Sequence, residues 1–106
     1  MALENEVLRV TGDYLTLKRY CFWRANNTPV FQNDKGNARF RSMPRFSKHG
    51  VPDFILVKQG KFIGLECKKK GGYQSEHQKI FQQDIEKAGG QYYVIRSLED
   101  LQKIGL

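Results

Sequence analysis

The sequence predicts a single α/β domain over residues 1–106, in which helices flank a mixed β-sheet. Three patterns support this fold class: an amphipathic helix near the start, two apolar strands joined by a tight turn at residues 53–68, and a strand–helix–strand unit at residues 61–95. A tight turn joins antiparallel strands, whereas a helical crossover usually joins parallel ones, so the sheet should contain both pairings. A chain of 106 residues has material for one hydrophobic core.

The first half of the chain predicts one helix, one short strand and a long loop. Apolar residues at helical spacing indicate a helix over residues 3–18, although Gly12 weakens the pattern. The aromatic residues at 20–23 favour a short strand. Turn-forming residues are frequent over residues 24–50, so we expect a long loop there. The buried stripe of the helix is predicted to comprise Val7, Val10, Tyr14 and Leu17.

Two adjacent strands are predicted at residues 53–57 and 61–68, joined by a turn in which Gly60 supplies a positive φ. Successive side chains of a strand point to opposite faces. One face of the second strand should therefore carry Phe62, Gly64, Glu66 and Lys68. The opposite, more obviously buried face should carry Ile63, Leu65 and Cys67.

The last third of the chain predicts a helix, a strand and a short terminal helix. Ser75 begins the first helix, and Gln78 completes a capping box. Glycines at 89–90 end it. A strand over 91–95 and a helix over 97–104 follow. The inner side of the longer helix is predicted to carry Ile80, Phe81, Ile85 and Ala88.

The charge balance favours a polyanionic partner. Lys and Arg number 18 against 11 Asp and Glu, which gives a formal net charge of +7. Basic residues alternate with aromatic ones in the second half of the predicted loop, where they can meet phosphates and stack on bases. The alternative is a solvated loop whose phenylalanines pack into the core. The loop residues concerned are Lys35, Arg39, Arg41, Arg45 and Lys48, with Phe40 and Phe46 between them.

The cysteine, histidine and hydropathy patterns predict free thiols, no zinc site and no membrane span. Cys21 and Cys67 lie in apolar runs and are predicted to be buried thiols rather than a disulfide. His49 and His77 are too isolated in sequence to suggest a zinc site. We expect no signal peptide and no membrane span, and hence a cytoplasmic location.

An acidic cluster is the strongest chemical signal. A tight hairpin would bring Asp53 beside Glu66, with Lys68 on the same face as Glu66. Two carboxylates and the backbone carbonyl of Cys67 suit a hard cation such as Mg²⁺ or Mn²⁺. Such an ion neutralises a phosphodiester and acidifies a bound water, while the lysine stabilises the charge that builds at phosphorus. The alternative is a solvated hairpin face.

Three segments carry a more specific signal. Residues 50–53 read Gly-Val-Pro-Asp, residues 66–68 read Glu-Cys-Lys, and residues 72–78 read Gly-Tyr-Gln-Ser-Glu-His-Gln. In this order and spacing they resemble the PD-(D/E)XK nuclease superfamily, in particular the small stand-alone VRR-NUC nucleases of phages and bacteria. The likeness extends to residues 4–7 and to the end of the chain, so it covers nearly all of it.

The resemblance implies a restriction-endonuclease-like core and metal-dependent cleavage of DNA. Asp53 and Glu66 would be the central metal ligands and Lys68 the catalytic lysine. A glutamate of the first helix, Glu4 or alternatively Glu6, would complete the metal site. Gln78 would lie near the scissile phosphate, although its capping role explains it equally well. The residues expected to bind nucleic acid are Arg24, Arg39, Arg41, Arg45, Lys48, Lys69 and Lys70.

Three hypotheses of function follow. The first is a Mg²⁺- or Mn²⁺-dependent endodeoxyribonuclease in a bacterial or phage-infected cell, acting as a homodimer on branched or Holliday-junction DNA. The second is a basic nucleic-acid-binding module that keeps the fold without turnover. The third is a structural subunit whose basic face binds an acidic protein.

Overall fold

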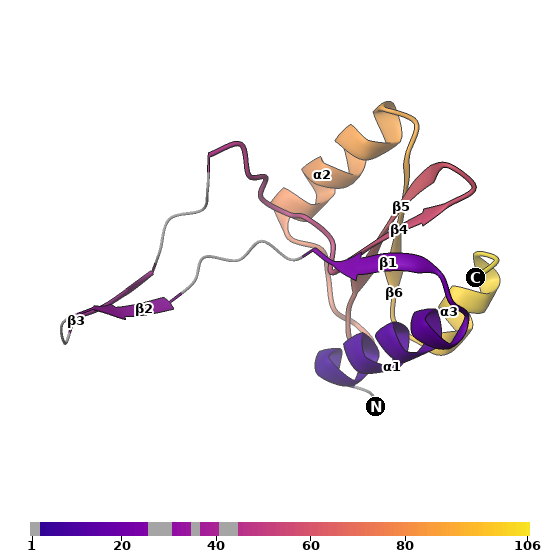
Figure 1. Cartoon of the computed structure of the whole chain (residues 1–106), viewed down its shortest axis with the longest axis horizontal. Helices are drawn as coiled ribbons and strands as arrows, with labels where there is room; N and C mark the ends of the chain where they lie inside the picture. The colour runs from indigo at the N-terminus through magenta and orange to yellow at the C-terminus, as the bar shows by residue number, and fades with distance from the viewer. Residues whose placement is uncertain (1–2, 26–30, 35–36, 41–44) are drawn as a thin grey trace.

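The computed structural model describes residues 3–25, 31–34, 37–40 and 45–106. Figure 1 shows a sheet with α1 and α3 on one side and α2 on the other. The described elements, in chain order, are α1 (Glu4–Leu17), β1 (Cys21–Arg24), β2 (Phe31–Asp34), β3 (Asn37–Phe40), β4 (Phe54–Lys58), β5 (Lys61–Cys67), α2 (Glu76–Lys87), β6 (Gln91–Ile95) and α3 (Leu98–Lys103).

The four-stranded sheet has the order β1-β4-β5-β6. β1 pairs antiparallel with β4, and β4 pairs antiparallel with β5. β5 and β6 are parallel and are joined through α2, which confirms the predicted mixed sheet. Gln59 and Gly60, with φ of 52° and 76°, form the tight turn between β4 and β5. The central strand β5 therefore lies between one antiparallel and one parallel neighbour.

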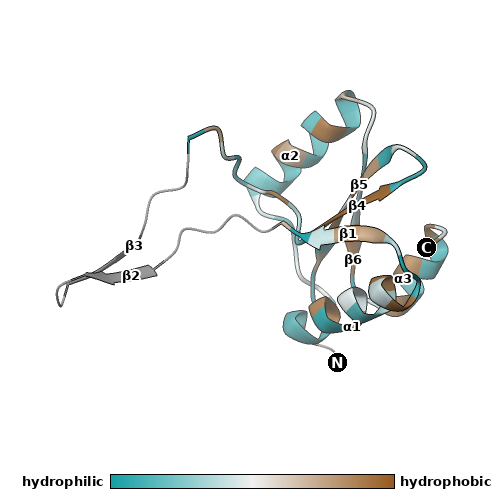
Figure 2. Ribbon diagram, viewed as in Figure 1, coloured by the Kyte–Doolittle hydropathy of each residue, from teal (hydrophilic) through white to brown (hydrophobic). Residues whose placement is uncertain are grey.

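The main core lies between the sheet and the pair α1 and α3. As predicted, Ile63, Leu65 and Cys67 of β5 are buried on this face. They pack with apolar side chains of the other strands and of the two helices, and Figure 2 shows hydrophobic residues running along β4. The remaining buried members of this core are Val7, Leu15, Phe54, Leu56, Ile95, Leu101 and Leu106.

Helix α2 lies on the opposite face of the sheet, and fewer of its residues pack against the sheet than the sequence predicted. Phe81 is buried and Ile85 is half-buried, but Ile80 and Ala88 are exposed, so their assignment to the inner side is wrong. α2 packs mainly against β6, so only a thin stripe of the helix meets the sheet. Figure 2 shows the hydrophilic character of much of α2.

The phase of the predicted α1 stripe is also wrong. The buried positions are Val7, Thr11 and Leu15, spaced four residues apart, whereas Leu17 is exposed. The Cys67 thiol donates a hydrogen bond to the Thr11 hydroxyl over 3.6 Å, and this contact makes burial of the threonine possible. Val10 and Tyr14 are only half-buried.

Two further predictions need correction. Residues 24–50 are not all loop, because β2 and β3 pair antiparallel in a separate sheet. Asn and Asp within these short strands signalled a turn, but pairing overrides such weak preferences. Cys21 is exposed rather than buried, because it lies on the edge strand β1 opposite Val57, which is itself exposed. Both cysteines are free thiols, as expected.

Among the helices that the structure describes, none is both long enough and apolar enough to cross a membrane.

Candidate functional site

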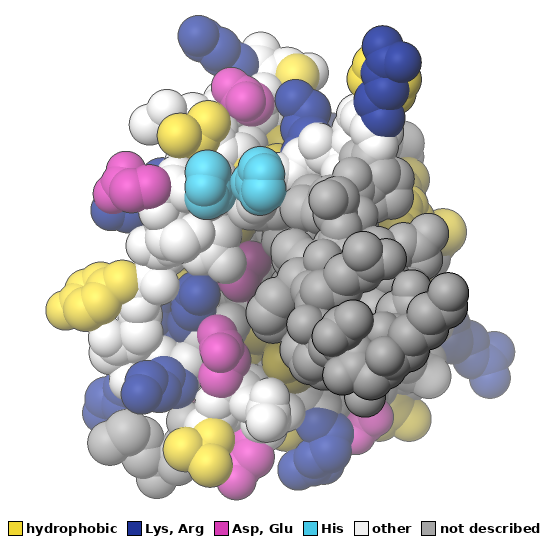
Figure 3. All heavy atoms as spheres, turned by 90° about the vertical axis from the view of Figure 1, so that its left-hand side faces the viewer, with side chains coloured by type: hydrophobic (Ala, Val, Ile, Leu, Met, Phe, Trp, Pro, Cys, Tyr) yellow, Lys and Arg dark blue, Asp and Glu magenta, His cyan; other side chains and the backbone are white. Residues whose placement is uncertain are grey.

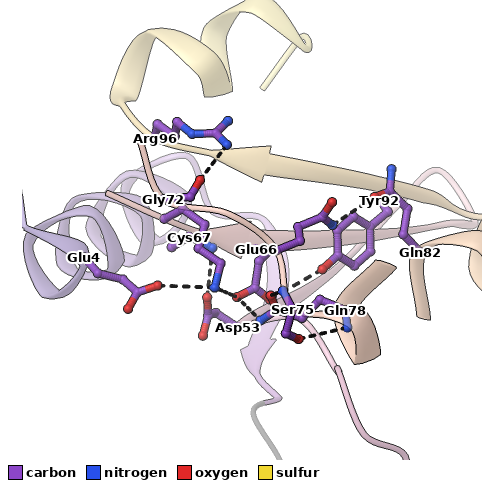
Figure 4. A network of polar contacts seen from close by, with 12 residues as sticks. Glu4, Asp53, Glu66, Cys67, Gly72, Ser75, Gln78, Gln82, Tyr92 and Arg96 are labelled. Carbon is purple, nitrogen blue, oxygen red and sulfur yellow. Dashed lines mark hydrogen bonds and ion pairs between the residues drawn. The ribbon is translucent and has the colours of Figure 1, made fainter. Parts of the chain in front are cut away.

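Asp53 and Glu66 lie together at one end of the sheet. Asp53 directly precedes β4, and Glu66 is the penultimate residue of β5. Their exposed fractions are only 6% and 3%. The backbone N–H of Cys67 donates a 2.8 Å hydrogen bond to Asp53 Oδ2, which fixes the aspartate against the end of β5. The predicted hairpin geometry therefore brings the two carboxyl groups together (Figure 4).

The electrostatics of this pair are unfavourable for two negative charges. Burial, the charge of Asp53 and a hydrogen bond with its side chain raise the pKa of Glu66 to about 8. The nearby Lys68 ammonium lowers that pKa again, but only in part. In the absence of a further cation, Glu66 is therefore largely protonated near neutral pH.

α2 holds Glu66 through its first turn. Gln78 forms the predicted capping box: its Oε1 accepts from the Ser75 N–H over 2.8 Å, and its own N–H donates to Ser75 Oγ over 3.1 Å. The remaining amide nitrogen, Nε2, donates to Glu66 Oε1 over 2.8 Å. The predicted capping role of Gln78 is therefore confirmed, and the same side chain also orients the Glu66 carboxylate. Its predicted position near the scissile phosphate stays a prediction.

Lys68 and Glu4 complete the cluster. The Lys68 ammonium lies 3.7 Å from Glu66 Oε1 and 3.7 Å from Glu4 Oε1. Glu4 begins α1, so this helix contributes to the site beside β4, β5 and α2, and Figure 4 shows the carboxylates of Glu4, Asp53 and Glu66 pointing toward one place. Glu6 is exposed and lines a separate cavity beside Arg96. Of the two glutamates considered, Glu4 is the one in contact with Lys68.

The donor set suits a hard divalent cation. Carboxylate oxygens are the preferred ligands of Mg²⁺, which typically takes one or two carboxylates and keeps several waters. Among the described residues, no three His, Cys, Asp or Glu side chains are grouped closely enough to hold a metal ion by themselves. Asp53 and Glu66 would supply two side-chain ligands, and the Cys67 carbonyl and Glu4 stay predicted further ligands.

Most of the predicted nucleic-acid-binding residues lie on the surface. Arg24, Arg45 and Lys48 are exposed, and the Arg24 guanidinium lies over the Phe54 ring at 5.9 Å from its centre. Lys69 and Lys70 follow the site directly and are also exposed. Arg39 is in β3, and Arg41 lies outside the described residues. Figure 3 shows Lys and Arg side chains around acidic ones on one face of the molecule.

Sequence reasoning missed two contributors to the site. The Tyr92 hydroxyl donates to Glu66 Oε2 over 3.5 Å, and burial raises its own pKa. Tyr92 lies opposite Gly64 in the parallel pair β5–β6, so the register of the predicted strand–helix–strand unit could have indicated that Tyr92 lies close to Glu66. The second contributor is Arg96, which donates to the Gly72 carbonyl over 3.0 Å and so fastens the segment that leads into α2.

The structure gives a steric reason why the first residue of the motif at 50–53 is a glycine. Its φ is +78°, in the left-handed region that favours glycine. A Cβ placed on this residue would overlap the carbonyl group of His77 in the first turn of α2. The His49 and His77 rings stack with their centres 4.8 Å apart, and they are the cyan pair in Figure 3. The segment before Asp53 therefore packs directly against the helix that holds Glu66.

Comparison of the chain with protein-family models, with curated proteins and with solved structures found no match. The resemblance to PD-(D/E)XK nucleases accordingly stays a prediction.

Proposed function

We propose that this protein is a metal-dependent endodeoxyribonuclease with a restriction-endonuclease-like core of the PD-(D/E)XK type. The observation that carries the proposal is the buried pair Asp53 and Glu66 with the Lys68 ammonium 3.7 Å from Glu66. Burying two carboxyl groups side by side is costly unless they serve a cation or share a proton. A surface patch kept only for solubility has no need of such an arrangement.

Each residue has a distinct role in the proposed reaction. Asp53, Glu66 and the Cys67 carbonyl would hold Mg²⁺ or Mn²⁺, which supplies charge neutralisation at the phosphate and an activated water. Lys68 orients the attacking water and stabilises the negative charge that develops on the phosphorane oxygens. Gln78 and Tyr92 keep the Glu66 carboxylate in one orientation through their hydrogen bonds. Glu4 positions the Lys68 ammonium.

The proposed substrate is branched DNA, including Holliday junctions, and the proposed active form is a homodimer. Two sites related by a two-fold axis would permit paired cuts in the two strands of a junction. Light scattering with and without junction DNA tests this part. A mass corresponding to one chain under both conditions would remove the model of paired cuts.

The decisive experiment compares cleavage of labelled duplex, flap and four-way-junction DNA by wild type, Lys68→Ala and Lys61→Ala. Each protein is assayed with Mg²⁺, with Mn²⁺ and with EDTA. The two variants lose the same charge, but Lys68 follows β5 and contacts Glu66, whereas the exposed Lys61 begins β5 at its other end. We expect metal-dependent cutting that falls at least about a hundredfold in Lys68→Ala and changes little in Lys61→Ala.

A non-catalytic nucleic-acid-binding module is the second candidate. The exposed basic residues Lys69, Lys70, Arg45 and Lys48 are independent of the acidic cluster and would serve that function alone. Metal-independent DNA binding without cutting by any of the three proteins, in either metal, would establish it and exclude the nuclease.

A further inference from the structure

A groove of about 490 Å³ lies beside the acidic site, between the end of β1, residues 46–51 and α2. Its floor includes Phe62 and the buried Phe81. Trp23 and Phe46 line its sides and are exposed by 49% and 87%. Lys48 also lines it, as does Arg24, whose guanidinium however lies over the Phe54 ring. Among the residues that the structure describes, no acidic one lines the groove. The groove is therefore apolar at its base, aromatic at its rim and positively charged.

The backbone connects this groove to the proposed catalytic residues. Trp23 and Arg24 pair with Ile55 and Phe54 at the start of β4. The N–H of Ala25, which also lines the groove, donates to the Asp53 carbonyl over 2.9 Å. A ligand in the groove would thus lie next to the segment that carries Asp53.

The rim is unusual for a surface that only meets water. Phe46 has a φ of +70°, a conformation that is costly for a residue with a bulky side chain, yet its ring remains exposed. The Arg45 guanidinium lies 4.8 Å from the centre of that ring, so a cation accompanies the aromatic face. Strained backbone that presents an apolar ring to solvent is typical of a binding position.

We propose that this groove binds an unpaired segment of DNA, with bases stacked on Trp23 and Phe46 and phosphates facing Lys48. Exposed aromatic rings can stack only on base faces that are free, and in a duplex these faces are covered by neighbouring base pairs. The part of the lining that the structure describes holds no acidic side chain, and this complements a polyanion. That the bound strand then continues toward Asp53 and Glu66 rests on the proposed nuclease function.

The test uses Trp23, the single tryptophan of the chain, as an intrinsic reporter. The fluorescence of the full-length protein in EDTA is titrated with a short oligothymidylate, with a duplex of the same length and with an oligouridylate. We expect saturable quenching by oligothymidylate that exceeds the quenching by duplex. Simple electrostatic attraction predicts the reverse order, because a duplex carries the higher charge density.

Variants of the rim sharpen the test. Phe46→Ala should weaken the binding of oligothymidylate about tenfold, whereas Phe46→Tyr should retain it, because the second variant keeps a ring for stacking. Leu17→Ala is the matched control, since it removes a similarly exposed apolar side chain from α1. Lys48→Gln should reduce the dependence of log affinity on log salt by about 0.7.

Several outcomes would overturn the proposal. These are equal or stronger quenching by duplex, tighter binding of oligouridylate, unchanged affinity in Phe46→Ala, and a fluorescence change with protein concentration alone, which would show that a second copy covers Trp23. The nuclease proposal fails separately. Metal-dependent cutting without quenching refutes the groove alone, and quenching without cutting refutes the nuclease alone.

Discussion

The two faces of the sheet use the same strand for different purposes. On the side of α1 and α3, β5 contributes Ile63, Leu65 and Cys67 to a closed apolar core. On the side of α2, the alternate residues Gly64 and Glu66 are just as buried, but they adjoin Pro52, Gln78 and Tyr92. One face thus supplies stability through packing, and the other holds a carboxyl group whose burial is unfavourable. The comparison indicates that packing on the side of α1 and α3 provides the stability that offsets the unfavourable burial of Glu66 on the side of α2.

The largest effect should come from damaging the packed face. Leu65→Ala removes a side chain with no exposed surface and should lower the free energy of unfolding by about 2–5 kcal/mol, measured by urea denaturation. Ile80→Ala on α2 is the control, because that side chain is 53% exposed and its loss should cost well under ~1 kcal/mol. Similar losses in the two variants would contradict the assignment of the core to one face.

A second prediction concerns the junction between the Asp53 segment and α2. Gly50→Ala should lower stability by about 2–4 kcal/mol, because the added Cβ would overlap the His77 backbone. The control is Gly71→Ala, whose φ of +81° is similar but whose Cβ would meet nothing within 4 Å. It reports backbone strain alone, about 1–2 kcal/mol. Equal costs for the two variants, measured by urea denaturation, would show that close packing against α2 is unimportant.

A third prediction concerns Glu66 on the polar face and the way in which it makes the stability of the metal-free protein depend on pH. Unfolded Glu66 ionises near pH ~4.3, whereas its pKa in the folded, metal-free protein is about 8. The folded state therefore binds this proton more tightly. The contribution of this proton to the free energy of unfolding is fully present below pH ~4.3 and is lost as the pH rises through about 8.

Glu66→Gln mimics the protonated side chain and should remove this pH dependence. Near pH ~8.5 the metal-free variant should be more stable than wild type by about 1 kcal/mol or more, with a much smaller difference near pH ~5. Added Mg²⁺ should stabilise wild type but not the variant. Thermal unfolding in EDTA and in Mg²⁺ measures both effects. Parallel pH profiles for the two proteins would show that Glu66 is not the group responsible.

The sequence predicted the parts of the fold that depend on local pattern. Alternation in β5 assigned Glu66 and Leu65 to opposite faces, and the Ser75 capping box gave the start of α2. Patterns failed where packing decides. The helical spacing of α1 favoured Leu17 over Thr11, because polarity alone does not reveal that a buried thiol lies opposite the threonine. Likewise, turn-prone residues concealed β2 and β3.

For the candidate site, the sequence by itself determined which chemical groups are available. Asp53, Glu66 and Lys68 occur at fixed spacing, and the first helix carries acidic residues. Tertiary structure alone decided which groups meet. It brought Glu4 rather than Glu6 to Lys68, set Tyr92 against Glu66, and placed Trp23 and Phe46 around one groove. The physical reason is that strand alternation and capping act over a few residues, whereas these contacts join segments distant in the chain and depend on how helices pack on the sheet.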